Sequence, residues 1–219
     1  MNKISITAIS DLHGDYPKLE GGDLLIVAGD LTALDKGFQY ALFESWLCEQ
    51  KYRRKIVIAG NHDKLIQKGH WNFAKPDEDV TYLQDNYIEF EGYKIYGSPW
   101  SRYFAGVNPH CNAYMHHHDI TMEETWAKIP DDVDILVTHT PAHNILDISR
   151  NGERYGCRYL AKRLQELKQL KLHVFGHLHA GYGEQLVTNI DSTNAYKAVN
   201  AAHNTEDYEP INPPIRVVI

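Results

Sequence analysis

Five short polar motifs contain residue types that bind metal ions, and each motif follows an apolar stretch of the chain. They combine Asp, His and Asn with small residues, at positions 11–14, 29–30, 60–63, 138–140 and 176–179. Carboxylate, imidazole and amide oxygen groups are ligands that suit Mn, Fe, Zn, Co or Ni. A single Asp-x-His or Gly-Asp is common in turns and caps, so each motif alone predicts little. Together, the five predict a metal site.

The spacing within the motifs favours shared binding. Asp-x-His and His-x-His place two side chains on the same side of extended backbone, so each pair can bind one centre. Asp11 and His13 form one such pair, and His177 and His179 form another. Asp30 stands alone in its motif, and its two carboxylate oxygens could bridge two cations. We therefore predict Asp30 as the bridging residue.

The elements that must position these motifs are short strands. Runs such as LLIVAG and KIVIAG are apolar at consecutive positions, which is typical of strands buried on both faces. Helical periodicity occurs in Phe38, Leu42 and Trp46 and again over 157–167. This alternation predicts a layered mixed α/β sandwich, and the crevice beyond the carboxyl ends of its strands is where polar loops converge. Strands are expected at 3–9, 23–28, 55–59, 87–90, 93–96, 134–138, 172–175, 185–190, 195–201 and 215–219.

Length and composition limit the function classes. The 219 residues are enough for one domain with a substantial core, and the formal net charge of −7 disfavours long nucleic acid as a partner. The sequence has no apolar run that could span a bilayer and no secretory signal, so we expect a cytoplasmic protein without membrane contact. The three cysteines form no CxxC pair, which argues against a thiolate zinc site.

The order of the motifs resembles that of the calcineurin-like metallophosphoesterases, namely D-x-H, G-D, G-N-H-[DE], a lone His and G-H-x-H. The similarity spans nearly the whole chain. Stretches such as KIVIAGNHD, LHVFGHLH and INPPI are similar to the small cyclic-nucleotide-phosphodiesterase branch, which includes the animal metallophosphoesterase-domain proteins. The resemblance implies a four-layer α/β/β/α sandwich with mixed sheets, formed by residues 1–219 as a single domain.

The same resemblance implies a centre of two divalent metal ions, with Mn favoured over Fe, Zn, Ni or Co. Some animal members have Gly at the first His of the last motif. This chain has His177 there, so a complete site is expected. The implied ligands are Asp11, His13 and His179 for the first ion, Asn61, His139 and His177 for the second, and Asp30 for both.

The implied reaction is attack on phosphorus by a hydroxide that bridges the two ions, with His62 as the general acid. In the larger protein phosphatases an aspartate three residues after the bridging one orients this histidine. Ala33 occupies that position here, so the orienting group stays open. We interpret Asp63 as a cap of the following segment in preference to a catalytic partner.

The expected substrate is a small phosphoester, namely a cyclic nucleotide or another small phosphodiester. Arg102 and Phe104 could hold a phosphate oxygen and stack a base, or belong to a packed aromatic loop. His143 could point into the cleft or serve loop packing. The alternatives are a phosphomonoesterase or protein phosphatase, because the same centre serves both reactions, and a non-catalytic nucleotide-sensing protein. A nuclease is disfavoured, since only the short stretch 51–55 is strongly basic.

Overall fold

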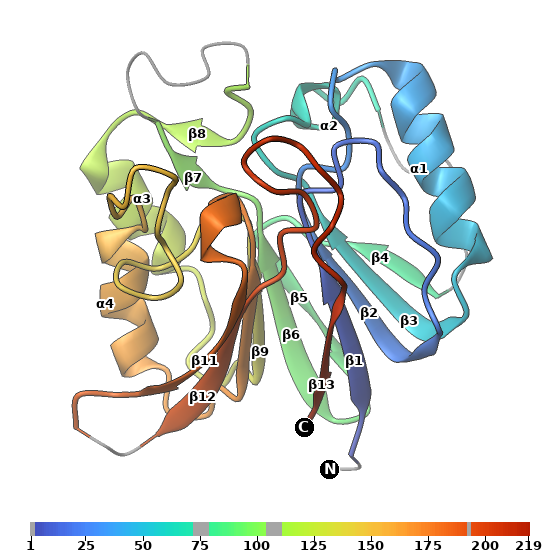
Figure 1. Cartoon of the computed structure of the whole chain (residues 1–219). Coiled ribbons are helices and arrows are strands. Elements are labelled where there is room, and N and C mark those ends of the chain that lie inside the picture. The colour runs from blue at the N-terminus through green and yellow to red at the C-terminus, as the bar shows by residue number, and fades with distance from the viewer. Residues whose placement is uncertain (1–2, 72–78, 104–110, 192–193) are drawn as a thin grey trace.

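Two β-sheets lie face to face and carry helices on their outer sides (Figure 1). The computed structural model describes residues 3–71, 79–103, 111–191 and 194–219. In the first sheet all neighbouring strands are parallel except β13 (Ile215–Val218), which runs antiparallel to β1 (Ser5–Ile9). Within the described residues this sheet has the spatial order β13 (Ile215–Val218), β1 (Ser5–Ile9), β2 (Gly22–Ala28), β3 (Tyr52–Ile58) and β4 (Val80–Tyr82).

The second sheet is also mixed. Its inner strands are parallel, and the two edge strands, β11 (Gly183–Thr188) and β5 (Asn86–Phe90), pair antiparallel with their neighbours. A separate parallel pair consists of β7 (Ser101–Arg102) and β8 (Met115–His116). The order across the second sheet is β11 (Gly183–Thr188), β12 (Ala195–Asn200), β10 (Leu172–Phe175), β9 (Ile135–Thr138), β6 (Tyr93–Ser98) and β5 (Asn86–Phe90).

The helices complete four layers. Helix α1 (Gly37–Glu49) packs on the first sheet, whereas α3 (Asp119–Trp126) and α4 (Arg158–Glu166) pack on the second (Figure 1). Two short helices, α2 (Lys64–Gln67) and the 3₁₀ helix η1 (His179–Gly181), lie close to polar motifs. The four-layer α/β/β/α sandwich with mixed sheets predicted from the sequence is therefore confirmed.

Alternation along the inner strands explains why their sequences are apolar throughout. In β2, Leu24 and Ile26 belong to the cluster between the two sheets, while Leu25 and Val27 belong to the cluster under α1. Successive side chains of a strand point to opposite faces, and both faces of β2 are covered. Each such buried side chain stabilises the fold by roughly 1.5–3 kcal/mol.

The buried face of α1 differs from the prediction. We expected Phe38, Leu42 and Trp46 to face the core, but Phe38 is 62% and Leu42 is 56% exposed. Trp46 is buried together with Tyr40 and Phe43. The helix carries two apolar stripes, and the sheet packs against the one that contains the larger aromatic rings. Periodicity alone did not distinguish these two stripes.

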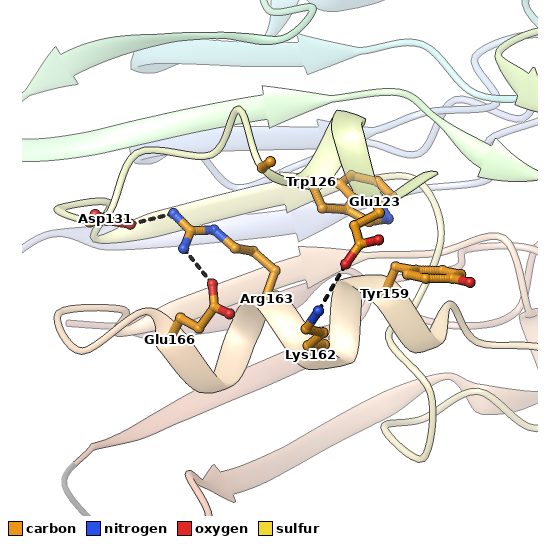
Figure 2. A pocket seen from close by; sticks show the side chains of 8 residues that line it. Glu123, Trp126, Asp131, Tyr159, Lys162, Arg163 and Glu166 are labelled. Carbon is orange, nitrogen blue, oxygen red and sulfur yellow. Dashed lines mark hydrogen bonds and ion pairs between the residues drawn. The ribbon is translucent and has the colours of Figure 1, made fainter. Parts of the chain in front are cut away.

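A surface cavity of about 260 Å³ lies between α3 and α4 (Figure 2). Its charged side chains are paired with one another: Lys162 with Glu123 at 2.8 Å, and Arg163 with Glu166 at 2.7 Å. Arg163 also contacts Asp131 at 2.5 Å. The Lys162–Glu123 pair links α4 to α3, whereas the Arg163–Glu166 pair lies within α4. Among the described residues, the groups that could hold a metal ion lie elsewhere in the chain.

The polar motifs gather at one edge of the sandwich. Strands β1, β2, β3, β9 and β10 all end there, and each is followed by one of the five motifs. In Figure 1 this edge lies opposite to the chain termini, and the connection from β12 to β13 arches over it. Among the described residues, no helix has the length and apolar character needed to span a bilayer.

Candidate metal centre

The backbone is strained where the motifs leave their strands. Asp11, His13, Asp30 and His177 all adopt left-handed backbone conformations, with φ between 46° and 68°. This region costs a residue with a Cβ about 1–3 kcal/mol, so it persists only where the surroundings enforce it. Four of the seven predicted metal ligands are among the residues that carry this strain.

The first group of converging side chains contains Asp11, His13 and His179. The Nε2 atom of His179 lies 3.3 Å from Asp11 Oδ1 and 3.3 Å from His13 Nε2. On the other side of the ring, His179 Nδ1 lies 2.9 Å from the carbonyl oxygen of Thr205. A carbonyl only accepts, so Nδ1 carries a proton there and Nε2 is directed at the other two residues.

The second group contains Asn61, His139 and His177. The side-chain oxygen of Asn61 lies 2.9 Å from His139 Nε2 and 2.8 Å from His177 Nδ1. His139 Nδ1 donates to the carbonyl oxygen of Ala28 at 2.9 Å, which fixes its Nε2 toward the group. The three side chains therefore direct their potential metal-binding atoms toward one point.

Asp30 lies between the two groups. Its Oδ1 is 3.4 Å from His139 Nε2, and its Oδ2 is 3.9 Å from His13 Nε2. The backbone N–H of His62 donates to Oδ1 at 2.8 Å and holds the carboxylate. A Cβ on Gly60 would lie 2.3 Å from Oδ1, so glycine is needed for this close approach. The two oxygens of Asp30 face different sets of donors.

The buried carboxylates and imidazoles of the centre shift one another's pKa values. Burial alone would raise the pKa of Asp30, but attraction from His139 and His62 holds that pKa well below its usual range. In turn, burial opposes the charge on His139 and His179, while Asp30 and Asp11, respectively, raise the pKa of each ring to about 9. Protons on these two rings hold the carboxylates in place.

The donor set fits divalent cations. Burial lowers the pKa of His13 to about 4 and that of His177 to about 3, so both rings are neutral at physiological pH, which is the form in which an imidazole can bind a metal. Asp11, His13 and His179 offer ligand atoms within 4.8 Å of one another, as do Asp11, Asp30 and His139. The seven residues supply nitrogen and oxygen atoms only, which matches Mn, Fe, Zn, Co or Ni.

His62 has an orienting group that the sequence did not reveal. Its Nδ1 lies 3.4 Å from the backbone carbonyl of Ala33, the residue that replaces the orienting aspartate of the larger phosphatases. Burial disfavours its charge, but attraction from Asp30 and a hydrogen bond with the Cys111 side chain raise the pKa of His62 to about 10. The ring is therefore protonated at neutral pH in the absence of metal.

Asp63 does not cap α2 through its side chain, contrary to the prediction. It directly precedes α2, yet its carboxylate accepts from the backbone N–H of Gly60 at 2.8 Å and of Leu31 at 3.2 Å. Burial, with repulsion from Asp30, raises its pKa to about 7. The residue thus connects the loops after β2 and β3 and helps to position the donors that they carry.

A cavity of about 70 Å³ opens between the two groups, lined by Asp30, Asn61, His62, His177, His179, Glu206 and Tyr208. Glu206 and Tyr208 were not predicted. They lie in the connection from β12 to β13, which also provides Thr205 and Asn204, whose Nδ2 donates to the carbonyl oxygens of Asp11 and Leu12. The polar His203-Asn204 after an apolar strand was the available signal.

The predicted substrate-binding residues do not gather at this cavity. Arg102 pairs with Asp119 at 3.3 Å in a half-exposed position, and His143 Nδ1 lies 3.5 Å from Asp147 Oδ2. Neither is among the described residues that line the cavity. Phe104 lies outside the described residues. A role in substrate binding for these three residues stays a prediction.

Comparison with known proteins assigns the family. The family model described as calcineurin-like phosphoesterase matches residues 4–181, which include all seven donors and His62. The chain belongs to this calcineurin-like phosphoesterase family. The metallophosphoesterase domain-containing protein 1 of Homo sapiens and that of Mus musculus are each 37% identical to it, over 94% of this chain and 68% of theirs. The resemblance inferred from the motifs is confirmed.

A solved crystal structure supports the fold of this calcineurin-like phosphoesterase. It is 14% identical in sequence and superimposes with a TM-score of 0.63, covering 91% of this chain and 90% of its own. At this identity the likeness concerns the fold alone. Family membership supports the assignment of the chain as a metal-dependent phosphoesterase and implies a dinuclear divalent metal centre.

Proposed function

We propose that this calcineurin-like phosphoesterase hydrolyses small phosphodiesters, cyclic nucleotides among them, with His62 as the general acid. The observation that carries the proposal is the position of Asp30 between two groups of donors, with one carboxylate oxygen toward each. A carboxylate in this position can serve two cations at once, as a two-metal phosphoesterase mechanism requires.

The proposed ligands follow from the two groups. Bound divalent cations, Mn in our proposal, supply Lewis acidity toward phosphoryl oxygens and lower the pKa of a water molecule toward neutrality. The side chains would hold these cations with pre-oriented rings, because the backbone carbonyls of Ala28 and Thr205 orient His139 and His179. One cation is assigned to Asp11, His13 and His179, the other to Asn61, His139 and His177, and both to Asp30.

His62 is suited to protonate the leaving oxygen. It lines the cavity, and its Nε2 lies 3.9 Å from Asp30 Oδ2, next to the reacting centre. The contact of Nδ1 with the Ala33 carbonyl leaves Nε2 to deliver the proton. A departing alkoxide such as a ribose oxygen needs that proton, because it is a poor leaving group on its own.

The lining of the cavity favours a diester over a monoester. Among the described residues that line it, none is Lys or Arg. A monoester dianion carries one more negative charge than a diester, and enzymes commonly neutralise such charge with Lys, Arg or metal ions. With only the cations available for this task, the singly charged diester is the better match.

A substrate comparison tests the proposal. The Mn-loaded protein should hydrolyse bis-(p-nitrophenyl) phosphate with a higher kcat/KM than p-nitrophenyl phosphate, and should then hydrolyse cyclic nucleotides. Removal of metal, verified by elemental analysis, should abolish turnover. Preference for the monoester would instead indicate a phosphomonoesterase or protein phosphatase. Nucleotide binding without hydrolysis by a metal-loaded protein would indicate a nucleotide sensor.

A further inference from the structure

Glu206 is a carboxylate at the wall of the cavity, and no step of the proposed reaction uses it. It lies in the turn formed by residues 204–209, between β12 and β13. Its Oε1 accepts a hydrogen bond from the backbone N–H of Ala180 at 3.2 Å. Ala180 directly follows His179, so this bond fixes the carboxylate beside a predicted metal ligand.

The turn itself is firmly held. The N–H of Tyr208 donates to the Thr205 carbonyl at 2.9 Å, and the N–H of Thr205 donates to the Glu209 carbonyl at 2.9 Å. Asn204 is fully buried and bonded to the loop after β1. The Tyr208 ring packs edge-on against His13, with ring centroids 4.9 Å apart. Glu206 is therefore presented by a rigid segment and does not swing freely on a loose loop.

Its charge matters because the cavity is small. A phosphoryl group inside a space of about 70 Å³ lies close to every lining residue. Asp11 and Asp30 already bring two negative charges to the centre, and Glu206 adds a third. Repulsion between the carboxylate and a phosphate group grows with the charge on that group, and it is strengthened where water is scarce. A dianion is penalised more than a monoanion.

We infer that Glu206 is a specificity-determining residue that selects phosphodiester monoanions against phosphomonoester dianions by like-charge repulsion. This is discrimination by a repulsive element, which acts against the wrong ligand without adding contacts to the right one. The inference rests on the proposed function, because it concerns the ligand of the same site.

The test compares Glu206→Gln with a matched control, Asp207→Asn. Both variants remove one negative charge from the same turn. Asp207 is exposed and pairs with Arg150 at 2.5 Å, and it does not line the cavity. A general effect of net charge would appear in both variants, whereas a local effect on the cavity would appear only in Glu206→Gln.

Two readouts are needed, one of them independent of turnover. Equilibrium binding of inorganic phosphate and of dimethyl phosphate to the Mn-loaded protein is measured by calorimetry at about pH 8, where inorganic phosphate is mainly a dianion and dimethyl phosphate a monoanion. In parallel, kcat/KM is measured for p-nitrophenyl phosphate and bis-(p-nitrophenyl) phosphate. Glu206→Gln should raise the affinity for phosphate relative to dimethyl phosphate, and the monoester-to-diester ratio of kcat/KM, by about tenfold.

Asp207→Asn should leave both ratios at the wild-type value. Unchanged ratios in Glu206→Gln, or equal shifts in both variants, would overturn the inference while leaving the phosphoesterase function intact. If the wild-type protein binds Mn and both anions but hydrolyses neither ester, the proposed function fails, and the binding ratio alone decides the role of Glu206. A protein that binds neither Mn nor the anions would contradict both.

Discussion

At the scale of single residues, three backbone carbonyls direct three of the five histidines of the centre. Ala28 accepts from His139, Thr205 accepts from His179, and Ala33 lies opposite Nδ1 of His62. In each case Nε2 is left to face the centre. These carbonyls act through the backbone, so any side chain that preserves the loop geometry can occupy their positions.

Replacement of His62 tests its role as an acid. His62→Ala should retain both metal ions, because the predicted ligands are untouched, and should lower kcat by roughly 10²–10⁴-fold on an ester with a poor leaving group. The loss should be smaller with a p-nitrophenol leaving group, which departs without a proton. The measurement is kcat on both ester types with metal content determined in parallel. Near wild-type turnover on the poor leaving group would show that His62 is not the acid.

Metal binding should release protons. In the metal-free protein the pKa values of His139 and His179 are about 9, so both rings are protonated near pH 7.5. A cation can bind their Nε2 atoms only after those protons leave, so the apparent Mn affinity should rise as pH increases toward about 9. Calorimetry in buffers of different ionisation enthalpy should count about two released protons. Binding without proton release would contradict the assignment of these two ligands.

Much of the residue-level picture was accessible from the sequence. The motifs predicted seven donors and His62, and the fold brings these eight residues together because each motif follows a strand. Glu206 and Tyr208 were not predicted, because the polar turn between β12 and β13 does not contain a metal-binding motif such as Asp-x-His or His-x-His. The orientation of His62 by Ala33 could not be predicted either, because every residue has a backbone carbonyl and the amino-acid type does not indicate where that carbonyl points.

At the scale of elements, the strands were the most predictable feature. Apolar runs buried on both faces gave β2, β9 and β10 within a residue or two, whereas the expected strand at 185–190 begins earlier, at Gly183. Short elements such as β4, β7 and α3 were missed, since they are too brief or too polar to show periodicity. The predicted buried face of α1 was wrong, because the helix has two apolar stripes and only its packing against the sheet determines which one is buried.

Glycines at the strand ends allow the elements to approach. A Cβ on Gly176 would lie 1.9 Å from Asp11 Oδ2 and 2.2 Å from Ser10 Oγ. Gly176→Ala should therefore displace Asp11 and weaken Mn binding by about 10–100-fold, the range seen when groups that support metal ligands are altered. A calorimetric titration of the variant with Mn checks this expectation.

The matched control is Gly37→Ala at the start of α1, where the nearest atom to an added Cβ is Trp71 Cζ3 at 3.7 Å. This variant should bind Mn as the wild-type protein does. Circular dichroism of Gly176→Ala separates a displaced ligand from an unfolded chain. Two ions bound at wild-type affinity in a folded Gly176→Ala variant would show that Asp11 does not depend on this close approach.

At the scale of the whole molecule, the centre joins the two sheets. Asp11, Asp30 and Asn61 follow strands of the first sheet, whereas His139 and His177 follow strands of the second. A cation held by ligands from both sheets stabilises the packed sandwich relative to the unfolded chain. The sequence could not reveal that ligands come from both sheets, because apolar runs predict strands but do not indicate which strands belong to the same sheet.

Mn should therefore raise the melting temperature. At about 100 times its Kd, one bound ion stabilises by roughly 2.7 kcal/mol, which corresponds to about 5–11 °C for a chain of this size. The raised pKa values of His139 and His179 stabilise the metal-free protein below about pH 6.5, and this contribution is lost as pH rises through about 9. The rise in melting temperature that Mn causes should therefore become larger as the pH increases from about 6.5 to about 9.

Thermal unfolding with and without Mn, at several pH values, checks both expectations. Asp30→Asn serves as the control and should lose most of the increment, since it impairs both proposed sites. One cooperative transition would agree with the single domain expected over residues 1–219. An increment that shrinks as pH rises would contradict the proposed competition between protons and metal.

The most direct test of the central claim is anomalous diffraction at the Mn edge from crystals soaked in Mn. We predict two peaks: one among Asp11, His13 and His179, one among Asn61, His139 and His177, with Asp30 in contact with both. Their heights should fall together in crystals of Asp30→Asn. A single peak, or peaks away from these seven side chains, would contradict the proposal that this chain cleaves phosphoesters with a pair of cations.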